Sequence, residues 1–322
     1  MYSPEFLRLK GFEVDRPLRA EEKNNELHSK KQQEGFNDDL PHYQLSVIQL
    51  NSTFVEITDR DYPVRGIVTM IALFASTLML TFLISVSVNT FNRWETIDLA
   101  NRPGKINSLL FFSALTLFVI AASLYGLLRE SFSYTHFPIR LNRKNRKVYV
   151  WRRDGTVFSA PWDKIFFYVR CYKKTGVHMW DIVGHVLAED RQTIRDSFTL
   201  SSYTSSDAID LQLHWEYFRR YMEEGPQQPF KMLKICLPIA KRRETWWEGF
   251  MRLSLLLHGS IMMQVLTIPF NLPASMGRLF AMRTSKIPRW PDWVEQECAV
   301  AKDDPYVRES GYEAPRNNAA AA

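Results

Sequence analysis

The sequence predicts an α+β membrane protein in which a two-helix transmembrane hairpin carries a cytoplasmic antiparallel β domain closed by one helix. Two observations predict this fold class. Two long uncharged apolar stretches lie in the first half of the chain, and a series of short apolar runs separated by turn residues follows them. Only 24% of the 322 residues are charged, but most of the chain lies outside the two stretches. We therefore expect a small anchor bearing a soluble domain rather than a multi-span transporter.

The hairpin is predicted from residues 66–88 and 106–127, neither of which contains Asp, Glu, Lys, Arg or His. At about 1.5 Å per residue, each stretch spans about 33 to 35 Å as a helix, enough to cross a hydrocarbon core of roughly 30 Å. The alternative is a pair of buried helices in a soluble core. Uncharged runs of this length are uncommon in soluble domains, so membrane spans are favoured.

The distribution of charge predicts the orientation of the hairpin. Residues 128–153 contain eight Lys and Arg but one acidic residue, whereas the loop 89–105 contains three basic residues. The positive-inside bias then places the loop outside and both termini in the cytoplasm. Six basic residues after the second span are predicted to form a collar that faces membrane lipid: Arg129, Arg140, Arg143, Lys144, Arg146 and Lys147.

The three cysteines are widely separated and odd in number, so they predict neither a disulfide framework nor a CxxC metal site. No apolar signal-peptide core is visible in the first 16 residues. The first span is therefore expected to direct membrane insertion.

Two segments precede the first span. Residues 1–42 are polar and of mixed charge, and are predicted to form an arm that carries no chemistry. Residues 43–65 contain the alternating run YQLSVIQLNSTFVEIT, which predicts one hairpin of two short strands. Pro63 then lies near the start of the first span and Arg65 at its lipid boundary.

Residues 138–226 are predicted to form the β domain, an antiparallel meander of about six strands. Ser205 or Ser206 can cap the helix that follows, and Gly225-Pro226 ends it. A meander closed by a C-terminal amphipathic helix resembles a pleckstrin-homology-type domain in architecture. The apolar face of this helix is predicted to contain Ile209, Leu213, Tyr217 and Tyr221.

Residues 227–300 are predicted to form an amphipathic helical region at the membrane interface, followed by a flexible tail over 301–322. A third span over 253–277 is the alternative, because His258 is the only ionisable residue there. Two prolines inside the stretch and the basic residues just beyond it argue against a third crossing. The predicted interfacial anchor is formed by Lys241, Arg242, Arg243, Trp246 and Trp247.

No sequence motif indicates catalysis: G-x-S-x-G, the P-loop, H-E-x-x-H and G-x-G-x-x-G are all absent. His178 and His185 flank Asp181, but on a strand their odd separation places the two imidazoles on opposite faces. We therefore expect a protein that is not an enzyme, with no metal and no cofactor. A basic collar beside a span is typical of lipid contact, so no nucleic-acid partner is expected.

The helix that closes the β domain offers a further candidate surface. Its sequence HWEYFRRYMEEGP combines aromatic and charged residues. The helix could close the domain and nothing more, or it could present a surface to a protein partner, and the sequence leaves both interpretations open. The residues of the predicted partner surface are Trp215, Arg219, Arg220, Glu223 and Glu224.

Three stretches in order around the hairpin, NSTFVEITDRDYPVRG, WEYFRRYMEEGP and IPRWPDWVEQE, resemble a family of bacterial inner-membrane proteins of undetermined biochemistry. Members are often encoded beside type VI secretion spike proteins and toxins. The likeness covers about residues 43–298. It implies an inner-membrane immunity protein that neutralises a cognate secreted toxin by direct binding, or else an effector-loading adaptor, and it supplies no catalytic residues.

A lipid- or signal-sensing module is a second class of function, suggested by the pleckstrin-homology-like pattern and the basic collar. The expected partners are thus a toxin protein and membrane lipids. Homo-oligomerisation is left open.

Overall fold

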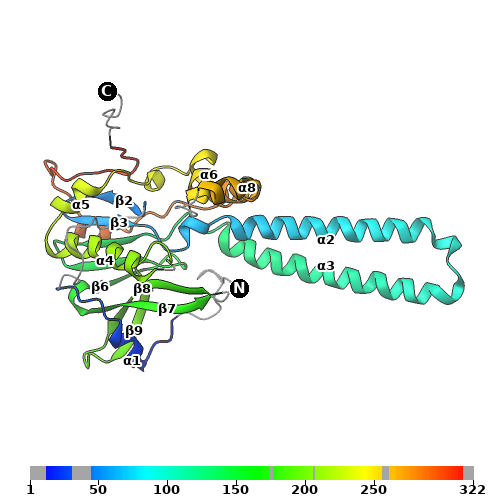
Figure 1. Cartoon of the computed structure of the whole chain (residues 1–322), viewed down its shortest axis with the longest axis horizontal. Coiled ribbons are helices and arrows are strands. Elements are labelled where there is room, and N and C mark those ends of the chain that lie inside the picture. The colour runs from blue at the N-terminus through cyan, green and yellow to red at the C-terminus, as the bar shows by residue number, and fades with distance from the viewer. Residues whose placement is uncertain (1–11, 31–44, 175–176, 206, 256–260, 315–322) are drawn as a thin grey trace. The chain divides into compact units, whose positions relative to one another are not determined.

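The computed structural model describes residues 12–30, 45–174, 177–205, 207–255 and 261–314 (Figure 1). The chain divides into two compact units. Unit 1 contains the residues up to Pro63, Tyr134–Glu244 and the residues from Ile287 onward. Unit 2 contains Val64–Ser133 and Thr245–Lys286. The structure is therefore of the α+β class, with sheets in unit 1 and long helices in unit 2.

Unit 1 contains two antiparallel sheets. The five-stranded sheet has the order β2-β3-β4-β5-β6, and the four-stranded sheet has the order β1-β9-β8-β7. The strands of the first sheet are β2 (Val47–Leu50), β3 (Phe54–Ile57), β4 (Ile139–Asn142), β5 (Lys147–Trp151) and β6 (Val157–Pro161). Those of the second are β1 (Arg16–Pro17), β7 (Ile165–Lys174), β8 (Val177–Leu187) and β9 (Thr193–Thr199).

The six strands expected from one meander are present as β4 to β9, but they are divided between the two sheets. The break falls at Pro161 and the 3₁₀ turn Trp162–Lys164 that follows it. The Trp162 side chain is fully buried and stacks on Trp215, with ring centroids 5.6 Å apart. The buried indole anchors the turn at which the chain passes from the first sheet to the second.

The strands before the first span belong to the same sheet as the strands after the second. β3 pairs with β4, so that Phe54 lies opposite Asn142 and Ile57 opposite Ile139. The expected separation of a 43–65 segment from the 138–226 β domain is therefore wrong, because a long-range strand pairing joins them. Tyr43 and Gln44, where the first expected strand begins, lie outside the described residues.

The polar N-terminal arm is partly folded. Arg16 and Pro17 pair with β9, and the short helix α1 (Ala20–Asn24) follows. The backbone N–H of Leu27 donates to the carbonyl of Phe167 on β7. Residues 16–27 of the expected polar arm thus join the four-stranded sheet. Residues 1–11 and 31–42 lie outside the described part of the chain.

The closing helix is α4 (Ala208–Glu223), and it packs into the core that both sheets share. Its N-cap is Asp207, whose side chain accepts a hydrogen bond from the Ile209 N–H, rather than the expected Ser205 or Ser206. Tyr217 and Tyr221 are buried as expected, but Ile209 is 55% exposed. Contacts with α5 (Gln227–Met232) help to bury α4 beyond a single face.

The outer face of the five-stranded sheet carries a second, smaller core. Side chains of β5 alternate, with Val148 and Val150 in the main core and Tyr149 and Trp151 in the second. Residues from 290 to 298, including helix α9 (Asp292–Glu297), cover this face. Trp151 meets Trp290 edge to face, with centroids 5.6 Å apart. The C-terminal segment is thus an integral part of unit 1.

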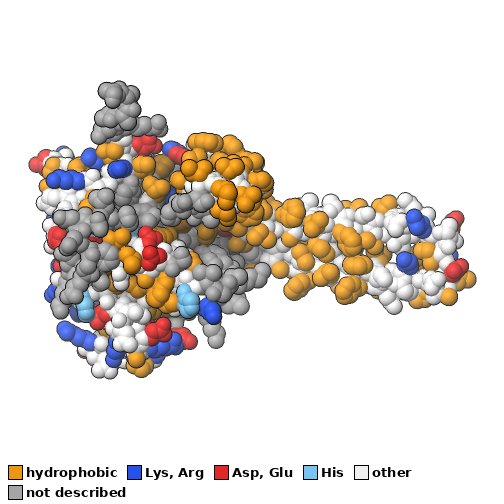
Figure 2. Space-filling view, viewed as in Figure 1, with side chains coloured by type: hydrophobic (Ala, Val, Ile, Leu, Met, Phe, Trp, Pro, Cys, Tyr) orange, Lys and Arg blue, Asp and Glu red, His pale blue; other side chains and the backbone are white. Residues whose placement is uncertain are grey.

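Unit 2 contains two helices long and apolar enough to cross a membrane, and hydrophobic side chains cover their surface (Figure 2). They are α2 (Ile67–Asn92) and α3 (Arg102–Glu130), a few residues longer than the expected 66–88 and 106–127. The remaining helices of the unit are α6 (Trp246–Leu255), α7 (Ile261–Leu266) and α8 (Ile268–Thr284). Further 3₁₀ turns lie at Tyr62–Val64, Trp94–Thr96, Leu99–Asn101 and Pro238–Ala240.

The alternative of a third span over 253–277 is not supported by these helices. α7 ends at Leu266 and α8 begins at Ile268, with Thr267 in a turn between them and Pro273 inside α8. α8 has 17 residues, fewer than the roughly 20 that a membrane-crossing helix requires. Residues 256–260, between α6 and α7, lie outside the described residues.

The base of the hairpin is fixed by a carboxylate. Glu130, at the end of α3, accepts hydrogen bonds from the backbone N–H groups of Gly66 and Thr69 at 2.8 and 2.6 Å, and from the Thr69 hydroxyl at 2.7 Å. These are the free N–H groups at the start of α2, where the helix dipole favours negative charge. Glu130 therefore acts as an N-cap supplied by the neighbouring helix.

Replacing Glu130 by Gln should lower the stability of unit 2 by about 2 kcal/mol, because an amide NH₂ would face backbone donors in a buried site. The measurement is thermal unfolding of the full chain in detergent, with the exposed Glu95→Gln as the matched control. An unchanged midpoint for Glu130→Gln would show that the cap contributes nothing.

Candidate functional site

Arg140, expected in the lipid-facing collar, is instead buried in unit 1 and only 3% exposed. Its Nε donates to Glu56 at 2.6 Å and its Nη2 to Glu295 at 3.0 Å. The guanidinium lies over the rings of Phe54 and Trp290, at 4.4 and 4.9 Å from their centroids. The prediction was wrong because β4 carries Arg140 onto the sheet face that the C-terminal segment covers.

The other collar residues do not form one surface. Arg146 is half-buried and pairs with Asp163 at 2.6 Å and Glu223 at 2.8 Å. Lys147 pairs with Glu297 at 2.6 Å. Arg143 donates to the carbonyl of Ser52, Lys144 is exposed, and Arg129 lies over the ring of Tyr125 in unit 2. Most basic side chains of the collar thus interact with groups of the same chain and not with the expected lipid headgroups.

The predicted partner surface on α4 is also largely wrong. Trp215, Arg219 and Arg220 are buried. Both arginines donate to Glu216, at distances of 2.7 and 2.8 Å. Glu224 is exposed but pairs with Arg219, and Glu223 accepts hydrogen bonds from Trp162 and Arg146. The helix fails as a surface because its charged residues neutralise one another inside the domain.

The predicted interfacial anchor is exposed. Lys241, Arg242 and Arg243 lie on the surface of unit 1, and Lys241 pairs with Glu309. Trp246 and Trp247 begin α6 in unit 2 and are also exposed. The side chains of all five residues are thus exposed, and their role as an interfacial anchor stays a prediction.

A groove of about 870 Å³ lies in unit 1 against the buried Arg140, and we refer to it as the Arg140 groove. Its charged side chains have both signs, which suits a polypeptide better than a single anion or cation. Part of its wall comes from the first and third of the family-like stretches. The residues that line the groove include Glu56, Arg140, Arg289, Trp290, Glu295 and Lys302.

A second pocket, of about 490 Å³, is lined by the ends of β4, β5 and β9 and by Asp59, Arg60 and Asp61. Its charges are paired, since Arg60 contacts Asp181, Arg153 contacts Asp61, and Arg152 contacts Asp196. Its floor contains core residues of both sheets. The Arg140 groove is the larger of these two pockets, and the charged side chains of Arg289 and Lys302 in its lining are exposed.

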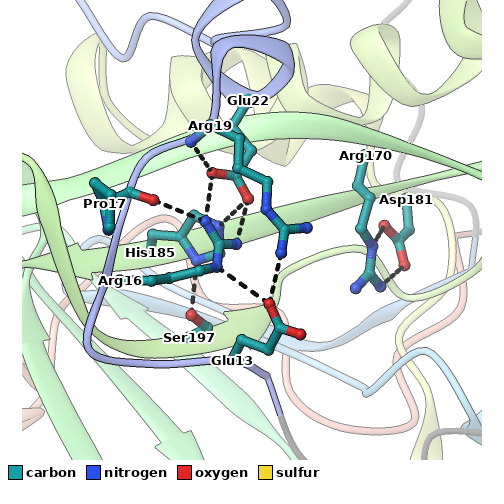
Figure 3. Close-up of polar contacts among 9 residues, drawn as sticks. All are labelled: Glu13, Arg16, Pro17, Arg19, Glu22, Arg170, Asp181, His185 and Ser197. Carbon is teal, nitrogen blue, oxygen red and sulfur yellow. Dashed lines mark hydrogen bonds and ion pairs between the residues drawn. The ribbon is translucent and has the colours of Figure 1, made fainter.

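A polar cluster lies where the N-terminal segment meets β8 and β9 (Figure 3). It consists of Arg16 and Glu22 from the N-terminal segment, His185 from β8 and Ser197 from β9. Arg16 donates to both carboxylate oxygens of Glu22, at 3.0 and 2.5 Å. His185 Nδ1 lies 2.6 Å from the Ser197 hydroxyl, and its Nε2 lies 3.4 Å from Glu22. Ser, His and Glu thus lie in a chain, the composition of a nucleophile, a base and an acid.

The electrostatics of this cluster favour a structural role. Burial lowers the pKa of His185 to about 4, so its imidazole is a weak base. Burial also raises the pKa of Glu22, but the hydrogen bonds from Arg16 and from the Arg19 N–H outweigh it and hold the pKa at about 2. Because Arg16 occupies both oxygens of Glu22, the cluster ties the N-terminal segment to β8 and β9.

His178, Asp181 and His185 do not converge on one point. Asp181 is fully buried and accepts from Arg170 at 2.9 and 2.5 Å, and from Arg60. His178 Nδ1 lies 3.4 Å from Cys171 Sγ, whereas His185 faces Glu22. Over the described ranges, no group of three or more His, Cys, Asp or Glu side chains could hold a metal ion.

Comparison with known proteins places this chain among relatives without assigned activity. The model of a family described as "Family of unknown function (DUF6708)" matches residues 116–302, more than half of the chain. The chain belongs to the DUF6708 family. No curated protein and no solved structure matches it.

The DUF6708 match begins within α3 and ends after α9, so it contains the buried Arg140 and its exposed partner Glu295. Glu56, the third member of this network, lies outside the match. Sequence reasoning missed the network, although an isolated acid in the strand FVEI and an isolated arginine in IRLN were signals of it. Opposite charges inside two apolar strands indicate a cross-strand ion pair.

Replacing Arg140 by Ala should destabilise unit 1 by about 3 to 5 kcal/mol, because Glu56 would remain buried without its cation. The measurement is chemical unfolding of the full chain, with the exposed Lys144→Ala as the control for loss of a basic residue from the same segment. Equal stabilities for the two variants would show that the buried pair contributes nothing to the free energy of unfolding.

Stability should fall as the pH is lowered from about 6.5 to about 4. His185 in the folded chain keeps its neutral form down to a pKa of about 4, whereas in the unfolded chain it takes up a proton near pH 6.5. Its contribution is thus present above pH 6.5 and is lost below it, by about 3 kcal/mol at most.

The check is the change in unfolding midpoint between pH 7 and pH 5 for the parent, His185→Gln and the exposed His28→Gln. The pH dependence should be weaker in His185→Gln and unchanged in His28→Gln. The same dependence in all three proteins would contradict the role given to His185.

Proposed function

We propose that this protein is a membrane-anchored binding protein of the bacterial inner membrane. The observation that carries the proposal is the insertion of the hairpin between β3 and β4, which are paired neighbours. The chain leaves the sheet after Ile57 and returns to it at Ile139, beside its point of departure. Two spans between these points hold unit 1 on one side of the membrane by both ends, and the charge bias makes that side cytoplasmic.

The partner that we propose is a cognate secreted toxin, with the protein acting as its immunity protein by direct binding. The family-like stretches support this proposal, because two of them contribute to the wall of the Arg140 groove. An immunity protein needs a surface located where the toxin acts and needs no reaction of its own. A groove of mixed charge fits a protein segment through complementary ion pairs and hydrogen bonds.

An effector-loading adaptor would use the same geometry but would also bind a component of the secretion spike. A lipid- or signal-sensing module is a further candidate, supported by the two antiparallel sheets that α4 closes and by the pleckstrin-homology-like pattern expected from the sequence. The three functions differ in what the purified full chain retains: the toxin alone, the toxin with a spike protein, or anionic lipid.

Deletion of the gene should make cells sensitive to sibling cells that deliver the toxin encoded beside it. Complementation with the parent chain should restore survival in co-culture, whereas Arg289→Glu combined with Lys302→Glu should restore it at least tenfold less. Both side chains are exposed and line the Arg140 groove, so their reversal changes the charge of the groove without emptying the core.

The matched control is Lys231→Glu, an exposed charge reversal outside the groove. It should protect as well as the parent at equal protein level. Unchanged survival of the deletion strain would remove the immunity proposal, and full protection by the groove variant would move the toxin contact elsewhere on unit 1.

A further inference from the structure

Helices α6, α7 and α8 of unit 2 expose an unusually continuous apolar surface, which Figure 2 shows gathered over α6 and α8. Between Leu253 and Met282 the described part of the chain contains one charged residue, Arg278, and it is 1% exposed. The exposed surface there consequently carries no charge in the described residues. The large exposed apolar side chains of the three helices include Trp247, Met251, Ile261, Met262, Val265, Leu266, Phe270, Leu272 and Met276.

Such a surface needs a covering. Monomeric soluble proteins rarely expose contiguous apolar patches larger than a few hundred Å², and larger ones mark contact with protein or membrane. In α7, Ile261, Met262 and Leu266 are 80, 75 and 68% exposed. A short helix with three such side chains is outside the ordinary range for a surface in water.

The position of these helices along the hairpin identifies the covering. α8 crosses the first turn of α2 so closely that a Cβ on Gly277 would lie 2.6 Å from the Gly66 carbonyl oxygen. Arg278 Nη1 donates to the Arg65 carbonyl at 3.0 Å. At its other end, the Lys286 N–H donates to the Ser133 carbonyl at 2.8 Å, just after α3. Unit 2 thus holds α8 at the end of the hairpin where α2 begins and α3 ends.

The length of α2 places that end of the hairpin at a membrane boundary. The 26 residues of α2 reach about 39 Å, which exceeds the roughly 30 Å hydrocarbon core. The first turn of α2 therefore falls in the interfacial layer, and helices packed against it lie beside that layer. Trp246 and Trp247 begin α6 there, and indoles concentrate at this depth in membrane proteins.

We propose that α6, α7 and α8 lie in the plane of the leaflet at the base of the hairpin, with their exposed apolar side chains among phospholipid acyl chains. The inference rests on the proposed membrane insertion of the hairpin. An interfacial helix buries its apolar side by about 5 to 10 Å. α7 is the deepest of the three because its side chains are the most exposed.

This placement gives the protein a third attachment to the membrane besides its two spans. It also accounts for the burial of Arg278, whose guanidinium donates a hydrogen bond to a backbone carbonyl at the helix crossing and does not face lipid. Exposed cations reappear only where α8 ends, at Arg283 and Lys286, where headgroup phosphates are in reach.

The test uses the full chain with Cys171→Ser, since Cys236 and Cys298 are buried, reconstituted in phospholipid nanodiscs. Single spin labels are placed by Ile261→Cys, Leu266→Cys and Met276→Cys. Leu78→Cys, exposed in the middle of α2, is the mid-span control, and Lys231→Cys, exposed on unit 1, is the aqueous control. The measurement is the collision rate of each label with oxygen, which concentrates in lipid, and with a water-soluble nickel complex.

The three labels on α7 and α8 should give oxygen-to-nickel ratios between those of the two controls, with the α7 labels deeper than Met276→Cys. Ratios equal to the aqueous control, with Leu78→Cys in lipid, would overturn the inference and leave the hairpin intact. Ratios equal to those of the mid-span control would overturn it in favour of a crossing. A Leu78→Cys label in water would instead reject the membrane hairpin, and with it the inference.

Discussion

The antiparallel pairing of β3 with β4 is the constraint on which the rest of the structure depends. It joins residues that are separated in sequence by the whole hairpin, with Ile57 opposite Ile139. The loop-closure entropy of such an insertion grows only slowly with its length, so a stable sheet can accommodate it. The insertion returns the chain to its starting point, which fits the two crossings of the proposed membrane hairpin.

Buried charges organise unit 1 around that pairing. Arg140 on β4 meets Glu56 on β3, Asp181 meets Arg60 and Arg170, and Glu216 meets both arginines of α4. Ion pairs of this kind contribute little net stability relative to apolar residues, but removing one partner is strongly destabilising. The first two of these groups connect segments that are distant in sequence, whereas Glu216 pairs with arginines of its own helix.

The sequence was sufficient for features that depend on local pattern. The two uncharged stretches predicted α2 and α3, and turn residues between apolar runs predicted the six strands β4 to β9. It was insufficient where distant segments cover a surface. Arg140 resembles an interfacial cation until residues 290–298 are placed over it. Arg219 and Arg220 resemble a partner surface until the packing of α4 into the shared core is known, because that packing buries them. Trp246 and Trp247 are exposed, and their role in an interfacial anchor stays a prediction.

The central claim is that unit 1 is attached at both ends to one face of the membrane and that the hairpin loop lies on the other. It is tested most directly by labelling single cysteines in spheroplasts with a membrane-impermeant maleimide. Cysteines at Asp98, in the loop, and at Lys231 and Lys302, in unit 1, are compared before and after the membrane is opened. The account predicts that only the Asp98 position reacts in intact spheroplasts. Labelling of either unit 1 position in intact cells, with the loop protected, would contradict it.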